Sequence, residues 1–140
     1  MKKTIEIVSE RNSLLRQRVE LDGFEDIFVD VPKAFGGEGN APDPHDYFDL
    51  SLGACKAITA QMYAKRKKWP LEGVSVIVNR DDSEEPKGTY RLEVVMTFHG
   101  IDDPEQRARL EEISHKCPIH RLMTSSTVDV ITRTADTSEV

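Results

Sequence analysis

The amino-acid sequence predicts a single α+β domain in which two helices pack on antiparallel sheet. In several short stretches near the N-terminus, and again in the middle of the chain, apolar residues alternate with polar ones, as in strands with one buried face. Two other stretches place apolar residues three and four positions apart and begin with residues that cap helices. No repeat or linker divides residues 1–133, and the polar tail 134–140 is predicted to be disordered.

The first third of the chain is predicted to form a meander of short antiparallel strands. Apolar residues alternate in residues 4–8, 15–21 and 27–31, and Asp22-Gly23 is a turn signal between the last two. Residues 35–44 contain three glycines and two prolines, which is typical of an irregular loop. This loop leads directly into the longest predicted helix.

The longest helix is expected to begin between residues 44 and 46 and to end by Trp69, because Pro70 follows. Asp43 is a suitable N-cap and Pro44 suits the first helical position. Helical spacing places Cys55 on one continuous stripe of this helix. The residues that share this stripe are Phe48, Ser51, Ile58 and Met62.

A long β-hairpin is predicted next, because alternation returns in residues 74–79 and 90–98 on either side of a polar turn. A second helix should begin at the run Asp102-Asp103-Pro104-Glu105, which combines caps, an early proline and acidic residues. Its spacing turns Cys117 inward, and Pro118 is expected to break or kink it. Residues 127–133 are predicted to form a final strand.

Length and composition limit the functions that the chain can have. With 140 residues and 38% hydrophobic residues, the core is modest unless a second copy shares it, so we expect a homodimer. The net charge is −6 and the basic residues form no long block, which disfavours nucleic acid and anionic membranes as partners. The apolar segment 47–64 contains Asp49, Lys56 and Gln61, as a buried helix does and a membrane span does not.

The N-terminus does not have the composition of a signal peptide, because no apolar stretch follows its two lysines. We therefore expect a cytoplasmic, reducing environment, in which a disulfide between the two cysteines is redox-active and not structural. A free cysteine is often simply a small buried hydrophobe. Small residues before Cys55 and a proline after Cys117 nevertheless favour a functional pair.

Four stretches of the sequence together resemble the OsmC/Ohr family of osmotically induced and organic-hydroperoxide-resistance proteins. They are residues 35–42, residues 46–55 ending in Cys55, residues 62–73, and the run Cys117-Pro-Ile-His-Arg-Leu. The resemblance covers most of residues 14–133 in the same order. It implies an OsmC-like fold of antiparallel sheets around two helices, and an intertwined homodimer whose active sites take residues from both chains. We expect no cofactor and no metal.

The resemblance also implies a cysteine-based hydroperoxide reductase of the oxidative stress response. Cys55 would attack the terminal peroxide oxygen, and Cys117 would resolve the resulting sulfenic acid into a disulfide. A dithiol of the lipoamide type would then reduce this disulfide. The sequence itself identifies neither the physiological peroxide nor the reductant.

A reactive cysteine needs a positive neighbour, because a free thiol with a pKa near ~8.5 is only a few per cent ionised at neutral pH. Helical geometry turns Lys56 away from Cys55. The candidates are Arg16 and Arg18, on the strand where the family carries its catalytic arginine, and alignment favours Arg16.

In the organic-hydroperoxide-resistance proteins, a glutamate ten residues before the cysteine holds this arginine. The sequence has His45 at that position, so we expect the adjacent Asp46 to take the role of the glutamate. Cys117 is expected near the C-terminal end of the second helix, where the helix dipole keeps a thiol protonated. The apolar side chains of Phe48, Leu50 and Met62 would suit an organic hydroperoxide tail or belong to the core.

Two other functions remain open from the sequence. A metal site would use His115, Cys117 and His120, but residues two apart do not share a helix face. The other alternative is a non-enzymatic dimer of the same fold that binds a small molecule or a partner and has slow cysteines.

Overall fold

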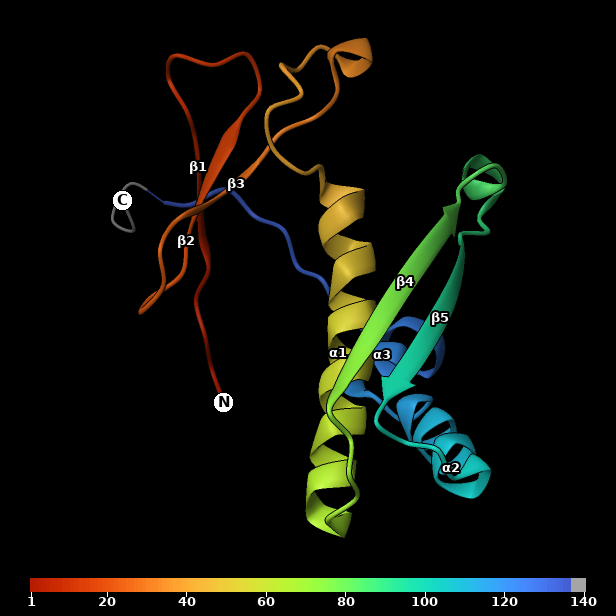
Figure 1. The fold of residues 1–140 in the computed structure, drawn as a ribbon. Helices are drawn as coiled ribbons and strands as arrows, with labels where there is room; N and C mark the ends of the chain where they lie inside the picture. Colours follow the sequence, from red (N-terminus) through yellow and green to blue (C-terminus); the bar gives the residue numbers. More distant parts are fainter. Residues whose placement is uncertain (137–140) are drawn as a thin grey trace. The chain divides into compact units, whose positions relative to one another are not determined.

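The computed structural model describes residues 1–136 and has an α+β fold of antiparallel strands and three helices (Figure 1). The chain divides into two compact units. Unit 1 comprises Met1–Ala54 and Ile77–Val95, and unit 2 comprises Cys55–Val76 and the chain from Met96 onward. The combination of helices and antiparallel strands confirms the predicted α+β class. Residues 137–140, four of the seven residues of the predicted tail, lie outside the described residues.

The N-terminal meander is a three-stranded antiparallel sheet in unit 1, in the order β1-β2-β3. Its strands are β1 (Glu6–Ser9), β2 (Gln17–Glu20) and β3 (Ile27–Val29), each inside or close to a predicted stretch. The predicted turn at Asp22-Gly23 is also present, because the Phe24 amide donates to the Leu21 carbonyl and Gly23 has φ +87°. Only glycine adopts this backbone conformation without strain.

The glycine-rich loop after β3 is organised by the buried carboxylate of Asp30. This side chain accepts hydrogen bonds from the backbone amides of Val31, Glu38 and Asn40. Burial alone would raise the pKa of Asp30, but the three amide donors outweigh it and hold the pKa below its usual value. The loop therefore has a defined path into the first helix.

Helix α1 (Pro44–Lys67) begins and ends where the sequence predicts. Its N-terminus is a reciprocal capping box, in which the Asp46 amide donates to Asp43 Oδ1 and the Asp43 amide donates to Asp46 Oδ2. Asp43 is therefore the N-cap, as expected. At the other end, Lys68 adopts a left-handed conformation with φ +59°, one residue after the helix.

The long predicted hairpin is present as β4 (Gly73–Asp81) and β5 (Arg91–His99). Along β5, partly buried residues alternate with exposed ones over the whole strand. The part of this hairpin in unit 2 packs on the core, whose buried members are Ala60, Tyr63, Ala64, Ile101 and Leu110. The core is small, as the length and composition predict.

The C-terminal region differs from the prediction in two respects. Helix α2 (Pro104–Ser114) has the expected Asp103 cap, but a further helix, α3 (Pro118–Ser125), begins at the proline expected to interrupt the chain. Proline suits this first helical position because its missing N–H has no intrahelical partner there. The predicted strand at 127–133 is wrong: residues 126–136 form no helix or strand, and Val130 and Ile131 are exposed.

Candidate functional site: two cysteines around a buried lysine

The two cysteines lie together in unit 2, although they come from different elements. Cys55 is near the middle of α1 and is partly exposed, whereas Cys117 lies between α2 and α3 and is fully buried. Both are free thiols. Burial raises the pKa of Cys117, and its hydrogen bond and charge interaction with Cys55 raise it further.

The pKa of Cys117 is raised by burial, and not by the helix dipole that the sequence predicts. It is not at the C-terminal end of α2, which stops at Ser114. Instead it is the N-cap of α3, and its Sγ accepts a hydrogen bond of 3.3 Å from the His120 amide. A helix N-terminus favours negative charge. The thiol stays protonated because it is buried beside a second sulfur.

Lys56 is the residue of this site that the sequence analysis excluded. Its side chain is buried in unit 2, where Nζ donates to the Ser114 carbonyl and to Nδ1 of His120, both at 2.9 Å. Its charge interacts with both thiols. A signal for this position exists in the sequence, since Lys56 lies four residues from Leu52 and from Ala60, both of which are buried.

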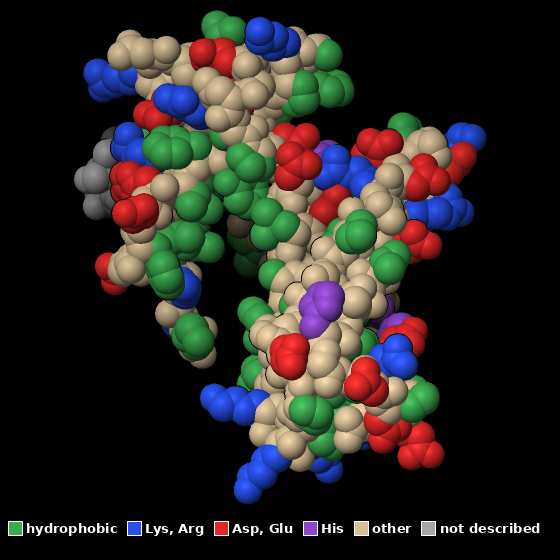
Figure 2. All heavy atoms as spheres, viewed as in Figure 1, with side chains coloured by type: hydrophobic (Ala, Val, Ile, Leu, Met, Phe, Trp, Pro, Cys, Tyr) green, Lys and Arg blue, Asp and Glu red, His purple; other side chains and the backbone are tan. Residues whose placement is uncertain are grey.

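Cys55, one position before Lys56 on α1, is partly exposed and lies on a different stripe of the helix. The other apolar residues of its stripe are exposed: Phe48 by 47%, Ile58 by 56% and Met62 by 66%, and Leu50, outside the stripe, is exposed by 49%. The interpretation of Phe48, Leu50 and Met62 as core is therefore wrong. Apolar side chains exposed on the surface of the chain are also plain in Figure 2.

The two candidate arginines lie in unit 1 and both contact Glu10. Arg16 Nη2 and Arg18 Nη1 are each 3.5 Å from a Glu10 carboxylate oxygen, so the two side chains share a face as predicted. Arg18 also pairs with Glu20 and Asp26. Arg16 instead stacks on the Phe28 ring, and its buried Nε has no acceptor within the described chain. Because the cysteines belong to unit 2, the role of either arginine at the thiol stays a prediction.

The expected pairing of Asp46 with Arg16 is not found within the described chain. Asp46 completes the capping box through one oxygen and accepts a hydrogen bond from Arg80 Nη2 at 2.8 Å through the other. The Asp43 amide and the Arg80 guanidinium lower the pKa of Asp46. The carboxylate that meets Arg16 is Glu10, which sequence reasoning missed because nothing local distinguishes it.

Arg80 also donates to the nearly buried carboxylate of Asp49, which accepts a further hydrogen bond of 2.7 Å from Tyr90. Burial, followed by this bond, raises the pKa of Tyr90 to about 12. These hydrogen bonds of Asp49 with Arg80 and Tyr90, the Asp49 network, link the first half of α1 to the hairpin within unit 1.

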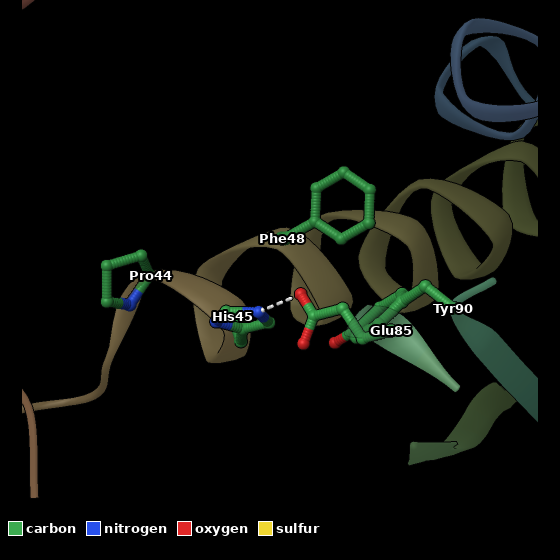
Figure 3. A pocket seen from close by; sticks show the side chains of 5 residues that line it. All are labelled: Pro44, His45, Phe48, Glu85 and Tyr90. Atoms are coloured by element: carbon green, nitrogen blue, oxygen red, sulfur yellow. Dashed lines mark hydrogen bonds and ion pairs between the residues drawn. The ribbon is translucent and has the colours of Figure 1, made fainter. Parts of the chain in front are cut away.

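A separate cavity of about 360 Å³ opens beside the start of α1 in unit 1 (Figure 3). At the wall of this cavity His45, which stands at the position of the family glutamate, donates a hydrogen bond of 2.6 Å from Nε2 to Oε1 of Glu85. This bond is the main reason that the pKa of His45 is raised. The remaining walls are Pro44, Phe48 and Tyr90.

Neither a metal cluster nor a membrane helix is found in the part of the chain that the structure describes. Within residues 1–136, no three side chains of His, Cys, Asp or Glu come together as metal ligands would. His115 and His120 face each other with ring centroids 5.9 Å apart. No described helix combines the length and apolar character needed to cross a membrane.

Several solved protein structures have a fold similar to that of this chain. A Psychrobacter arcticus protein attributed to the osmotic stress induced and detoxification response has a TM-score of 0.74 and 19% identity, covering 89% of this chain and 90% of that one. An organic hydroperoxide resistance protein OsmC of Legionella pneumophila has a TM-score of 0.64 and 22% identity, with 89% and 90% coverage. The organic hydroperoxide resistance protein OhrB of Bacillus subtilis has a TM-score of 0.57 and 18% identity, covering 89% of this chain and 92% of that one.

At these identities the solved structures show the fold alone. A search of curated proteins gave no sequence match. The profile of the family described as OsmC-like protein matches residues 37–133, well over half of the sequence. This chain therefore belongs to the OsmC-like protein family.

Proposed function

We propose that the protein is a thiol-dependent peroxidase that reduces organic hydroperoxides through Cys55 and Cys117. The observation that carries the proposal is the unequal environment of two hydrogen-bonded free thiols, one partly exposed and one fully buried. A peroxide reaches the exposed sulfur first. The buried thiol, held protonated, is suited to react only with an oxidised neighbour.

The cycle needs two chemical steps at the cysteines and one external reductant. The Cys55 thiolate attacks the terminal oxygen of ROOH, the O–O bond breaks, and ROH leaves after protonation, so Cys55 becomes a sulfenic acid. The Cys117 thiol then forms the S–S bond and releases water. A dithiol of the lipoamide type, expected from the resemblance, reduces the disulfide by exchange. A reducing cytoplasm fits a resting state with two free thiols.

We further propose that the active form is a homodimer. A monomer would leave much apolar surface in water, including the exposed stripe of α1 around Cys55 and the C-terminal residues Val130 and Ile131. A second copy of the chain would cover these residues, and the exposed side chains of Phe48, Leu50 and Met62 would then contact the organic part of the peroxide. Light scattering at micromolar concentration should give twice the chain mass, and an active monomer would contradict this proposal.

Rapid quench experiments test the roles of the cysteines. One equivalent of cumene hydroperoxide should consume two thiols rapidly in the parent protein, and Cys55→Ser should abolish this consumption. Cys117→Ser should still complete one turnover and leave a sulfenic acid that dimedone traps. Equal loss of the first turnover in both variants would refute the assignment. Parallel assays with hydrogen peroxide and several dithiols would identify the preferred substrate and reductant.

One observation favours the alternative of a non-enzymatic binding protein. The cavity at His45 and Tyr90 has the size of a small-molecule site and mostly apolar walls, and neither cysteine lines it. A binder would show negligible thiol loss in the same hydroperoxide experiment. That result would refute the peroxidase and favour the binding function.

A further inference from the structure

Lys56 carries a buried amine with no anion to neutralise it. The side chain is only 5% exposed, and Nζ donates to two neutral acceptors, the Ser114 carbonyl and Nδ1 of His120. Within residues 1–136 no carboxylate pairs with it. A buried ammonium is costly without an opposite charge, so this amine should exist either as the neutral base or as the partner of a thiolate.

Among residues 1–136, the groups whose negative charge interacts with Lys56 are the two thiols. Cys55 precedes it on α1, and Cys117 lies between α2 and α3; both interact with its charge. The remaining neighbours are the Ser114 carbonyl at the end of α2 and His120 on α3, with His115 beside the His120 ring. No other charged group is known to face the amine in the described chain.

The protonation of these neighbours is consistent with proton transfer at Lys56. Burial lowers the pKa of Lys56, and thiolate charge at Cys117 and Cys55 opposes this effect. Burial also lowers the pKa of His120, helped by Lys56 and His115. A neutral His120 leaves Nδ1 free to accept the hydrogen bond from Nζ, so the ring holds the amine in place.

We propose that Lys56 is the proton-transfer group of the peroxidase reaction and that His120 positions it. The neutral amine takes the proton from Cys55 Sγ–H, which gives a thiolate paired with an ammonium. The thiolate attacks the terminal oxygen of ROOH; the S–O bond forms and the O–O bond breaks with its electron pair on the alkoxide. The ammonium returns its proton to this alkoxide, so Cys–SH and ROOH become Cys–SOH and ROH.

This inference rests on the proposed function, but its first step can be tested without peroxide. The measurement is the rate of Cys55 alkylation by iodoacetamide as a function of pH, in a Cys117→Ser background. Lys56→Met should move the midpoint of this profile upward by about one pH unit or more, which is about tenfold slower alkylation at neutral pH. The matched control is Lys65→Met, which removes an exposed lysine from the same helix and should leave the profile unchanged.

Two further variants separate proton transfer from structure. Lys56→Gln retains hydrogen-bonding capacity toward Ser114 and His120 but has no basicity, so it should move the midpoint as Lys56→Met does. His120→Gln keeps an acceptor for Nζ and should move it less. Circular dichroism and thermal unfolding should show that Lys56→Met is folded, so that a changed midpoint does not reflect unfolding.

The outcomes distinguish this inference from the proposed function. An unchanged midpoint in folded Lys56 variants, while the parent protein reduces cumene hydroperoxide, overturns the role of Lys56 alone. A raised midpoint in a protein whose parent does not consume hydroperoxide supports proton transfer from Cys55 to Lys56 and overturns the peroxidase. A large loss of stability with an unchanged midpoint shows that Lys56 is only structural.

Discussion

The substitution Asp49→Asn tests whether hydrogen bonds between α1 and the β4–β5 hairpin stabilise unit 1. The carboxylate accepts hydrogen bonds from the Arg80 guanidinium and from the Tyr90 hydroxyl, and its side chain is only 10% exposed. Asparagine keeps the shape and one acceptor oxygen, but it has no negative charge. Both hydrogen bonds therefore lose their charge assistance.

The size of the effect follows from these contacts. A hydrogen bond to a charged group contributes about 1.5–3 kcal/mol. The Arg80 side chain is 28% exposed and keeps its bond to Asp46. The free energy of unfolding should therefore fall by an amount near the lower end of this range, about 2 kcal/mol. With a urea dependence of about 2 kcal/mol/M for a small protein, the unfolding midpoint should fall by about 1 M.

Urea unfolding followed by circular dichroism measures this shift, at one fixed protein concentration because a dimer is expected. The control is Glu84→Gln on the same hairpin, which removes an exposed ion pair with Lys87 and should cost less than about 0.5 kcal/mol. If Asp49→Asn shifts the midpoint no more than this control, the network does not hold α1 in the way described.

Two further predictions concern the glycine-rich loop and the His45 pair. Gly37→Ala should lower the free energy of unfolding in urea by about 3 kcal/mol, because the new Cβ would overlap the Val31 carbonyl and lie 2.7 Å from Asp30 Oδ1. The control is Gly73→Ala, whose new Cβ meets no atom within 4 Å and should leave the stability nearly unchanged. The NMR titration of His45 should have its midpoint above about 6.5, and Glu85→Gln should lower it. Because this pKa is raised on folding, the contribution of the pair to stability is present at lower pH and is lost as the pH rises through the folded-state value. An unshifted His45 titration, or equal effects of the two glycine variants, would contradict these interpretations.

The sequence alone determined the local elements and the family. Capping residues and prolines fixed both ends of α1, and alternation located the hairpin, because helix caps and strand periodicity depend on residues close together in the chain. The same local signals were misleading where one residue fits two roles. Pro118 was interpreted as a helix breaker, yet it begins α3, because proline is excluded from a helix interior but favoured in the first turn.

Only the tertiary structure decided which side chains meet. Lys56 bonds to Ser114 and His120, which are 58 and 64 residues away in sequence, so no local pattern names these partners. Its position beside Cys55 suggested that it pointed elsewhere on the helix, but the burial of that face around α2 and α3 brings its amine to the thiols. Likewise Asp46 meets Arg80 and not Arg16, because the hairpin presents a guanidinium to the start of α1. Partner choice depends on packing between distant segments, which hydrophobic periodicity does not specify.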